Sequence, residues 1–161
     1  MLRTLAITLV LTGAVFVAPG SAHEFKVGDL LVDHPWARPN LPNRPTAAYA
    51  TIANQGAASD RLISAFSPSF GKAEFHNSVH EDGIMKMQMV EGIEIPPQGE
   101  ATLAPGGYHI MLFDGGRQFE VGESFALELI FESAGTLEVT VKVKKWNRGT
   151  DHGTMGHGGT N

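Results

Sequence analysis

The residues best suited to chemistry in this sequence are histidines and methionines, because the chain contains no cysteine. Without a thiol, it cannot perform thiol catalysis or bind iron–sulfur clusters, zinc or copper through thiolates. Its 7 His and 6 Met are unevenly placed. They gather as His76, His80, Met85, Met87 and Met89, then His109 and Met111, and finally His152, Met155 and His157.

The pair His109 and Met111 is expected to share one face of a β-strand. Side chains alternate between the two faces of a strand, so Ile110 and Leu112 are expected to point into the core while the pair projects to the other side. By the same periodicity, the three methionines of residues 84–90 share one face. A histidine and a methionine on one strand face can chelate a single ion.

The donor types then select the ion. A thioether is soft and neutral and is a poor ligand for Zn²⁺, Mg²⁺ or Ca²⁺, whereas thioether together with imidazole suits Cu(I). A single methionine is more often a core filler, and a single histidine is more often structural. The combination of a His-x-Met pair with a second His/Met cluster upstream and a third downstream favours a copper site.

The remaining chain is dominated by short segments with the two-residue periodicity of strands. The predicted strands are Phe25–Val32, Ala47–Ala53, Arg61–Phe66, Lys72–Phe75, Ile84–Val90, Ala101–Leu103, His109–Phe113, Phe125–Phe131 and Leu137–Val143. Turn sequences separate them, at Asp82-Gly83, Pro96-Pro97, Pro105-Gly106-Gly107 and Asp114-Gly115-Gly116. Many short strands in one domain predict an all-β antiparallel sandwich or barrel.

The two ends of the chain differ from this domain. Residues 1–22 read as a secretory signal peptide, because Arg3 precedes an apolar run that is shorter than the roughly 20 residues of a membrane-spanning helix. Residues 23–145 are expected to form one domain, and residues 146–161 a disordered His/Met-containing tail. The formal net charge of −5 argues against a nucleic-acid partner. An exported protein without stable membrane insertion, located in the periplasm, is predicted.

The spacing of four of these residues resembles a known copper-binding motif. His76, Met87, His109 and Met111 match the pattern H-x10-M-x21-H-x-M of the PCuAC periplasmic copper chaperones. The neighbouring segments His34-Pro35-Trp36-Ala37-Arg38, Ala47-Ala48-Tyr49 and Pro105-Gly106-Gly107-Tyr108 are similar too. The resemblance covers about residues 25 to 145.

The resemblance implies a cupredoxin-like, Greek-key antiparallel β-sandwich. It also implies one Cu(I) held by His76, Met87, His109 and Met111, and delivery of that copper to a partner. The implied acceptor is the dinuclear CuA site of cytochrome c oxidase or another copper chaperone. Some members carry a His/Met-rich extension, and the residues His152, Met155 and His157 fit additional Cu(II) binding as well as they fit an incidental composition of the tail.

Several alternatives remain open at this stage. The protein could store or scavenge copper through its tail. It could less readily be a copper oxidoreductase, in which His23, as the mature N-terminal residue, chelates Cu(II). A blue-copper electron carrier is excluded, because such sites use a cysteine thiolate. His80 and Met85 are expected to support the site or the core rather than bind copper directly, and His34 to pack at a strand end. We therefore expect a binding and transfer protein rather than an enzyme.

Overall fold

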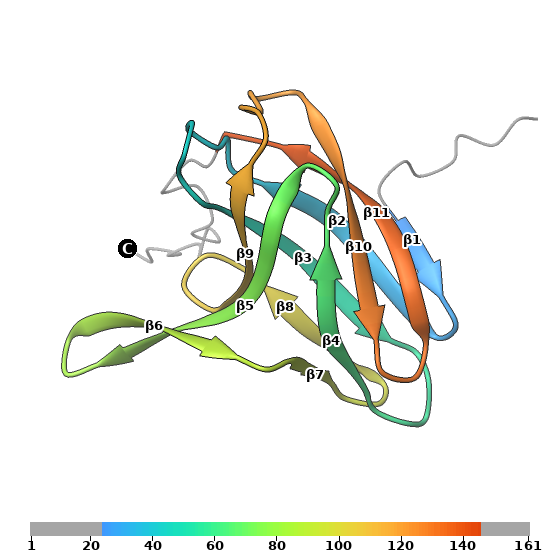
Figure 1. Ribbon diagram of the computed structural model, residues 1–161. Coiled ribbons are helices and arrows are strands. Elements are labelled where there is room, and N and C mark those ends of the chain that lie inside the picture. Colours follow the sequence, from blue (N-terminus) through green and yellow to red (C-terminus); the bar gives the residue numbers. More distant parts are fainter. Residues whose placement is uncertain (1–23, 146–161) are drawn as a thin grey trace, which may run out of the picture.

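The computed structural model describes residues 24–145, and within that range it contains β-strands and no helix (Figure 1). The first strands are β1 (Glu24–Val27), β2 (Leu30–Ala37), β3 (Thr46–Asn54) and β4 (Asp60–Phe66). The middle of the chain forms β5 (Phe70–Glu81), β6 (Ile84–Val90), β7 (Ile93–Ile95) and β8 (Gly99–Leu103). The last are β9 (Tyr108–Gly115), β10 (Ser124–Phe131) and β11 (Gly135–Val143).

The strands form one hydrogen-bonded path in the order β6-β5-β9-β8-β3-β2-β11-β10-β4-β7, with β1 paired to β2 and β9 also paired to β3. Most pairings are antiparallel, and β2–β11 and β8–β9 are parallel. Buried residues from both halves of this path belong to a single core cluster, which includes Leu112 on β9 and Leu129 on β10. The sheet must therefore curl so that its two halves face each other. This confirms the predicted all-β sandwich.

The alternating sequence pattern accounts for the core. Every second residue of β10 is buried, and the same alternation holds in β11 from Val139 onward, where Val139, Val141 and Val143 are each at most 1% exposed. One face of each strand thus lies in the core and the other faces solvent. The described residues contain no helix with the length and apolarity needed to cross a membrane.

The predicted strands exist, but some of their bounds differ. The segment Phe25–Val32 is two strands separated by a turn, and β5 continues to Glu81 instead of ending at Phe75. The three-residue strand β7 was not predicted. Asp114 and Gly115 lie in the end of β9, so the break expected from Asp114 begins two positions later, at Gly116. The turns at Asp82-Gly83 and Pro105-Gly106-Gly107 are present as predicted.

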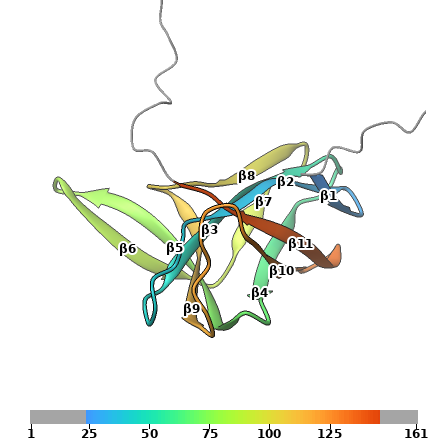
Figure 2. The same cartoon turned by 90° about the horizontal axis from the view of Figure 1, so that it is seen from above.

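The hairpin formed by β5 and β6 leaves the body of the domain. In both views it extends away from the other strands (Figure 1 and Figure 2). Only the first part of β5 pairs with β9, up to Asn77, while the pairing with β6 runs from Phe75 to Glu81. The outer end of the hairpin is thus a two-stranded arm.

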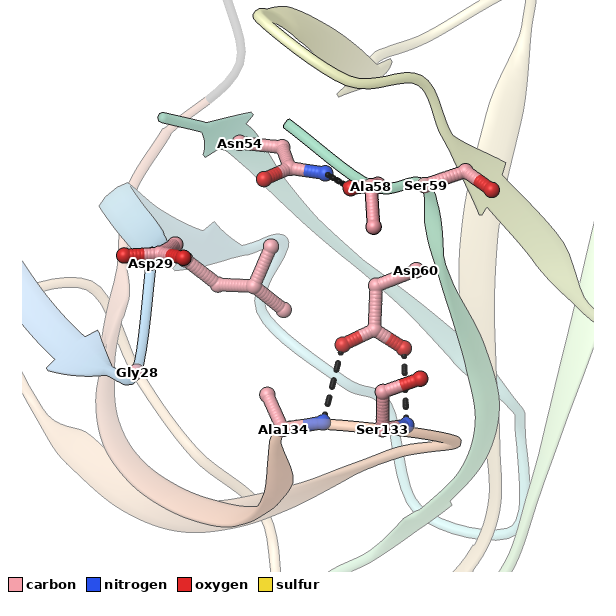
Figure 3. Close-up of a pocket in the computed structure, with 9 residues that line it drawn as sticks. Gly28, Asp29, Asn54, Ala58, Ser59, Asp60, Ser133 and Ala134 are labelled. Atoms are coloured by element: carbon pink, nitrogen blue, oxygen red, sulfur yellow. Dashed lines mark hydrogen bonds between the residues drawn. The ribbon is translucent and has the colours of Figure 1, made fainter. Parts of the chain in front are cut away.

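At the start of β4, the buried carboxylate of Asp60 joins two chain segments beside a small hollow (Figure 3). The two oxygens of Asp60 accept hydrogen bonds from the backbone N–H groups of Arg61, Ser133 and Ala134, at 2.7, 3.0 and 2.9 Å. Because backbone donors occupy both of its oxygens, the Asp60 carboxylate has a structural role and connects β4 to the β10–β11 turn.

We expect Asp60→Ala to lower the free energy of unfolding by roughly 1–3 kcal/mol, because it leaves buried backbone donors without an acceptor. Asp29, an exposed residue that lines the same hollow, supplies the control, and Asp29→Asn is expected to change stability by no more than about 0.5 kcal/mol. Urea unfolding followed by far-ultraviolet circular dichroism measures both. Equal urea midpoints for the two variants would contradict this structural role of Asp60.

Candidate metal centre

The pairing of β5 with β9 brings the two central histidines together. His76 lies directly opposite His109 in the antiparallel register, and their ring centroids are 5.8 Å apart. Met111 lies two residues further along β9, on the same face, opposite Glu74 of β5 and Ala47 of β3. Diagonal neighbours in such a ladder have Cα atoms about 7–8 Å apart, which is within reach of long side chains. His76, His109 and Met111 therefore face one region of space.

The opposite face of the same strands builds the core. Phe75, Ile110 and Leu112 are 6%, 2% and 0% exposed. The alternation predicted for β9 is therefore present, with apolar residues on the inner face and His109 and Met111 on the outer face. His109 is nevertheless only 5% exposed, because other side chains cover the outer face as well.

The methionines of β6 extend this outer face. Met89 lies directly opposite His76, and Met87 lies one pair further out, opposite Ser78. All three methionines of β6 are well exposed, with Met85, Met87 and Met89 at 55%, 60% and 68%. The register thus places Met87 diagonally beside His76, with Met89 nearer to it.

Hydrogen bonds fix which ring nitrogen of each histidine carries a proton. His109 Nδ1 lies 3.0 Å from the carbonyl oxygen of Gly107, and His76 Nε2 lies 2.9 Å from Glu74 Oε2. A carbonyl and an ionised carboxylate only accept hydrogen bonds, so both of these nitrogens must donate. In the neutral rings, the lone pairs are then on Nε2 of His109 and on Nδ1 of His76.

The surroundings of His109 and Glu74 favour a neutral imidazole and an ionised carboxylate. Burial lowers the pKa of His109, and the nearby His76 and Arg38 lower it further, while the hydrogen bond to Gly107 opposes this shift. His109 therefore stays neutral, with a free lone pair, to lower pH than an exposed histidine. Hydrogen bonds from Lys72 and His76 lower the pKa of Glu74, so its carboxylate is ionised at neutral pH.

An aromatic side chain from β3, Tyr49, borders His109 and in turn contacts Trp36 of β2. The ring centroid of Tyr49 is 6.3 Å from that of His109 and 4.5 Å from that of Trp36. Arg38 lies 5.5 Å from the Tyr49 ring centroid. Burial raises the pKa of Tyr49, with Arg38 opposing the shift, so its phenol remains neutral. The Tyr49 ring is one of the groups that cover His109, which is 5% exposed.

The donor set of this region is unsuited to hard ions. Among residues 24–145, no group of three or more His, Cys, Asp or Glu side chains lies close enough to hold a metal. Beside His76 and His109, the register instead supplies the sulfur of Met111 as a third donor. Soft thioethers with imidazole favour monovalent copper over zinc, magnesium or calcium.

Other candidate residues lie elsewhere. His80 is opposite Met85 near the tip of the hairpin, on the same face as His76. His34 lies on an irregularity of β2, exposed and next to the Asp33 carboxylate at 2.6 Å, so it does not pack at a strand end. The predicted leader, His23 and the tail residues His152, Met155 and His157 lie outside the described residues.

Two contributors to this region were not singled out from the sequence. Glu74 precedes His76 by two residues, and strand periodicity alone would have placed both side chains on one face. Tyr49 was noted only as part of the family resemblance. Its contact with His109 depends on the pairing of β3 with β9, for which the sequence carries no local signal.

Comparisons with known proteins show the family of this chain. A family model described as "Putative lipoprotein LpqE-like" matches residues 30–143. "Putative lipoprotein Lxx21020" of Leifsonia xyli subsp. xyli is 30% identical over 145 residues, which cover 88% of this chain and 87% of the relative.

Among solved structures, the copper-bound PCuAC domain from PmoF2 aligns with a TM-score of 0.65 at 31% identity, covering 76% of this chain and 97% of that domain. The Cu(I) form of DR1885 from Deinococcus radiodurans aligns with a TM-score of 0.59 at 30% identity, covering 78% of this chain and 83% of that protein. The chain therefore belongs to the LpqE-like family, and its β-sandwich is a cupredoxin-like PCuAC domain.

Proposed function

We propose that this protein is a copper chaperone that binds one Cu(I) through His76, Met87, His109 and Met111 and delivers it to a partner in the periplasm. The observation that carries the proposal is the cross-strand pair His76–His109, with Met111 on the same face of β9. Its similarity to a copper-bound PCuAC domain and to a Cu(I)-loaded protein supports the same metal here.

The chemistry of the four donors suits reversible binding. Two neutral imidazoles and two neutral thioethers leave the positive charge of Cu(I) intact, and thioethers need no deprotonation before they bind. A thiolate is a stronger soft ligand, so a partner that offers thiolates would draw the ion away by ligand exchange. A site of this kind transfers metal and requires no catalytic residue, so we propose no enzymatic activity.

The acceptor we propose is the CuA site of cytochrome c oxidase or another copper chaperone. CuA is a dinuclear copper centre, and its cysteine ligands provide the downhill step described above. We further propose that the tail residues His152, Met155 and His157 bind additional Cu(II). Imidazole is a good ligand for Cu(II) as well as for Cu(I).

His109→Ala and Met111→Ala are each expected to weaken Cu(I) binding by about tenfold to a hundredfold, or about 1.4–2.8 kcal/mol. Competition with a colorimetric Cu(I) chelator measures the affinity. Met87→Ala is expected to weaken it similarly, and Met89→Ala, which removes a thioether from the same face of β6, is the matched control. Unchanged affinity in both β9 variants would refute the site. If the β9 variants lose affinity and, of the two β6 variants, only Met89→Ala does so, the fourth ligand is Met89 instead of Met87.

The two histidines are expected to bind copper through different nitrogens, Nδ1 of His76 and Nε2 of His109, because Glu74 and Gly107 hold the other nitrogens. Long-range ¹⁵N–¹H correlation spectra of the apo protein report the tautomers directly. Glu74→Ala is expected to lower Cu(I) affinity by roughly 10–100-fold through loss of this orientation. Glu74→Gln keeps an acceptor oxygen and should lose less. Identical tautomers in the two rings would contradict this assignment.

Copper delivery is tested by mixing the Cu(I)-loaded protein with a purified soluble CuA domain, together with Cu(II) for the mixed-valence centre. The visible absorption of the dinuclear centre is expected to appear with the wild-type protein and to be greatly slowed with His109→Ala. Assembly at the same rate from free copper alone would argue against a delivery role.

A further inference from the structure

The outer face of the β5–β6 hairpin carries more soft ligands than the domain site uses. Three cross-strand pairs follow one another toward the tip, and five of their six residues are histidine or methionine. The pairs are His76–Met89, Ser78–Met87 and His80–Met85. We propose that the outer end of this face is a second Cu(I) site, formed by His80, Met85 and Met87, from which the ion is passed to the partner.

The register brings these three side chains within reach of one ion. Directly opposed residues such as His80 and Met85 have Cβ atoms about 4.5–5.5 Å apart. Met87 lies two residues from Met85 on the same face, a rise of roughly 6.6–6.8 Å along the strand. Methionine has three rotatable bonds, so both sulfurs can turn toward the imidazole of His80. Ser78, the partner of Met87, is short and leaves the space between them open.

Because these methionines are exposed, they do not pack in the hydrophobic core. Met85 and Met87 are 55% and 60% exposed on an arm that extends away from the domain (Figure 1). The charged side chains of this arm lie on the other face, where Lys86 contacts Glu81 at 2.6 Å. The residues opposite Met85, Met87 and Met89 are His80, Ser78 and His76, so no carboxylate, lysine or arginine faces these thioethers across the ladder. An accessible face rich in sulfur and imidazole suits the binding of monovalent copper.

Because the domain site is buried, a second and exposed site would help the protein to transfer copper to a partner. His109 is only 5% exposed, so a partner protein cannot easily bring its own ligands to an ion held there. Met87 lies between His76 and His80 along the hairpin face. We place it in both sites in turn, as the ligand that keeps hold of the ion while its other ligands exchange.

The transfer is a ligand exchange with no change of oxidation state. Bonds from Cu(I) to the His80 nitrogen and the Met85 sulfur form as those to His76, His109 and Met111 break. No electron is transferred, and neutral donors release no proton. The inference rests on the proposed chaperone function, since it presumes that the first ion occupies the domain site.

The experiment uses the full chain labelled with ¹³C at the methionine methyl groups and titrated with Ag(I), a redox-inert substitute for Cu(I). The first equivalent is expected to shift the Met87 and Met111 signals, and the second, which then has His80 and Met85 as its ligands, the Met85 signal. In His80→Ala/Met85→Ala, the second equivalent should bind about tenfold more weakly or worse, a change of about 1.4 kcal/mol. Copper transfer to an acceptor should slow by a similar factor, while the affinity for the first equivalent is unchanged.

Gln88→Ala, on the opposite face of β6, is the control and should alter neither step. A Met85 signal that stays in place through two equivalents would overturn the second site, even if the tail binds the second ion. Transfer from the double variant at the wild-type rate would overturn the proposed route. Failure of the first equivalent to move Met111 would instead refute the domain site, so the two proposals fail separately.

Discussion

The antiparallel register between β5 and β9 is the constraint on which the candidate site depends. It sets His76 opposite His109 and, by the same alternation, sets Phe75 opposite Ile110 on the core face. Slipping the register by one residue would turn every side chain of the strand to the other face. Burial of Phe75, Ile110 and Leu112 therefore prevents such a slip. The hydrophobic effect, acting on the inner face, aligns the two imidazoles on the outer face.

Burial of His109 adds a second consequence of the same packing. Tyr49 and His76 flank the ring, and the desolvation that results lowers its pKa. A neutral imidazole keeps its lone pair for a metal, whereas an exposed one loses it to a proton in mildly acidic surroundings. The hydrogen bond to Gly107 fixes which nitrogen carries that lone pair. Stability, protonation state and orientation thus have one structural origin.

Much of this arrangement follows from the sequence, and the rest does not for a physical reason. The two-residue period around Ile110 and Leu112 predicts that His109 and Met111 share the outer face, and they do. The strand predicted at Lys72–Phe75 was too short, because no residue of β5 beyond Phe75 is buried and that part lacks the alternation of a half-buried strand. The pairing of residues 76 and 109 is non-local, and only the resemblance to a known motif indicated it.

The arm also explains why the methionines of β6 tolerate exposure. A hydrophobic residue that contributes to stability should be buried, yet Met85, Met87 and Met89 lie in solvent along one strand. Beyond Asn77, β5 pairs with β6 alone, so Met85 and Met87 lie on a two-stranded arm that extends from the body of the domain. Burying them would bring the hairpin against the domain and close the face that a partner must reach. Their exposure is consistent with ligands that have to be shared between two proteins, first by this chain and then by the acceptor.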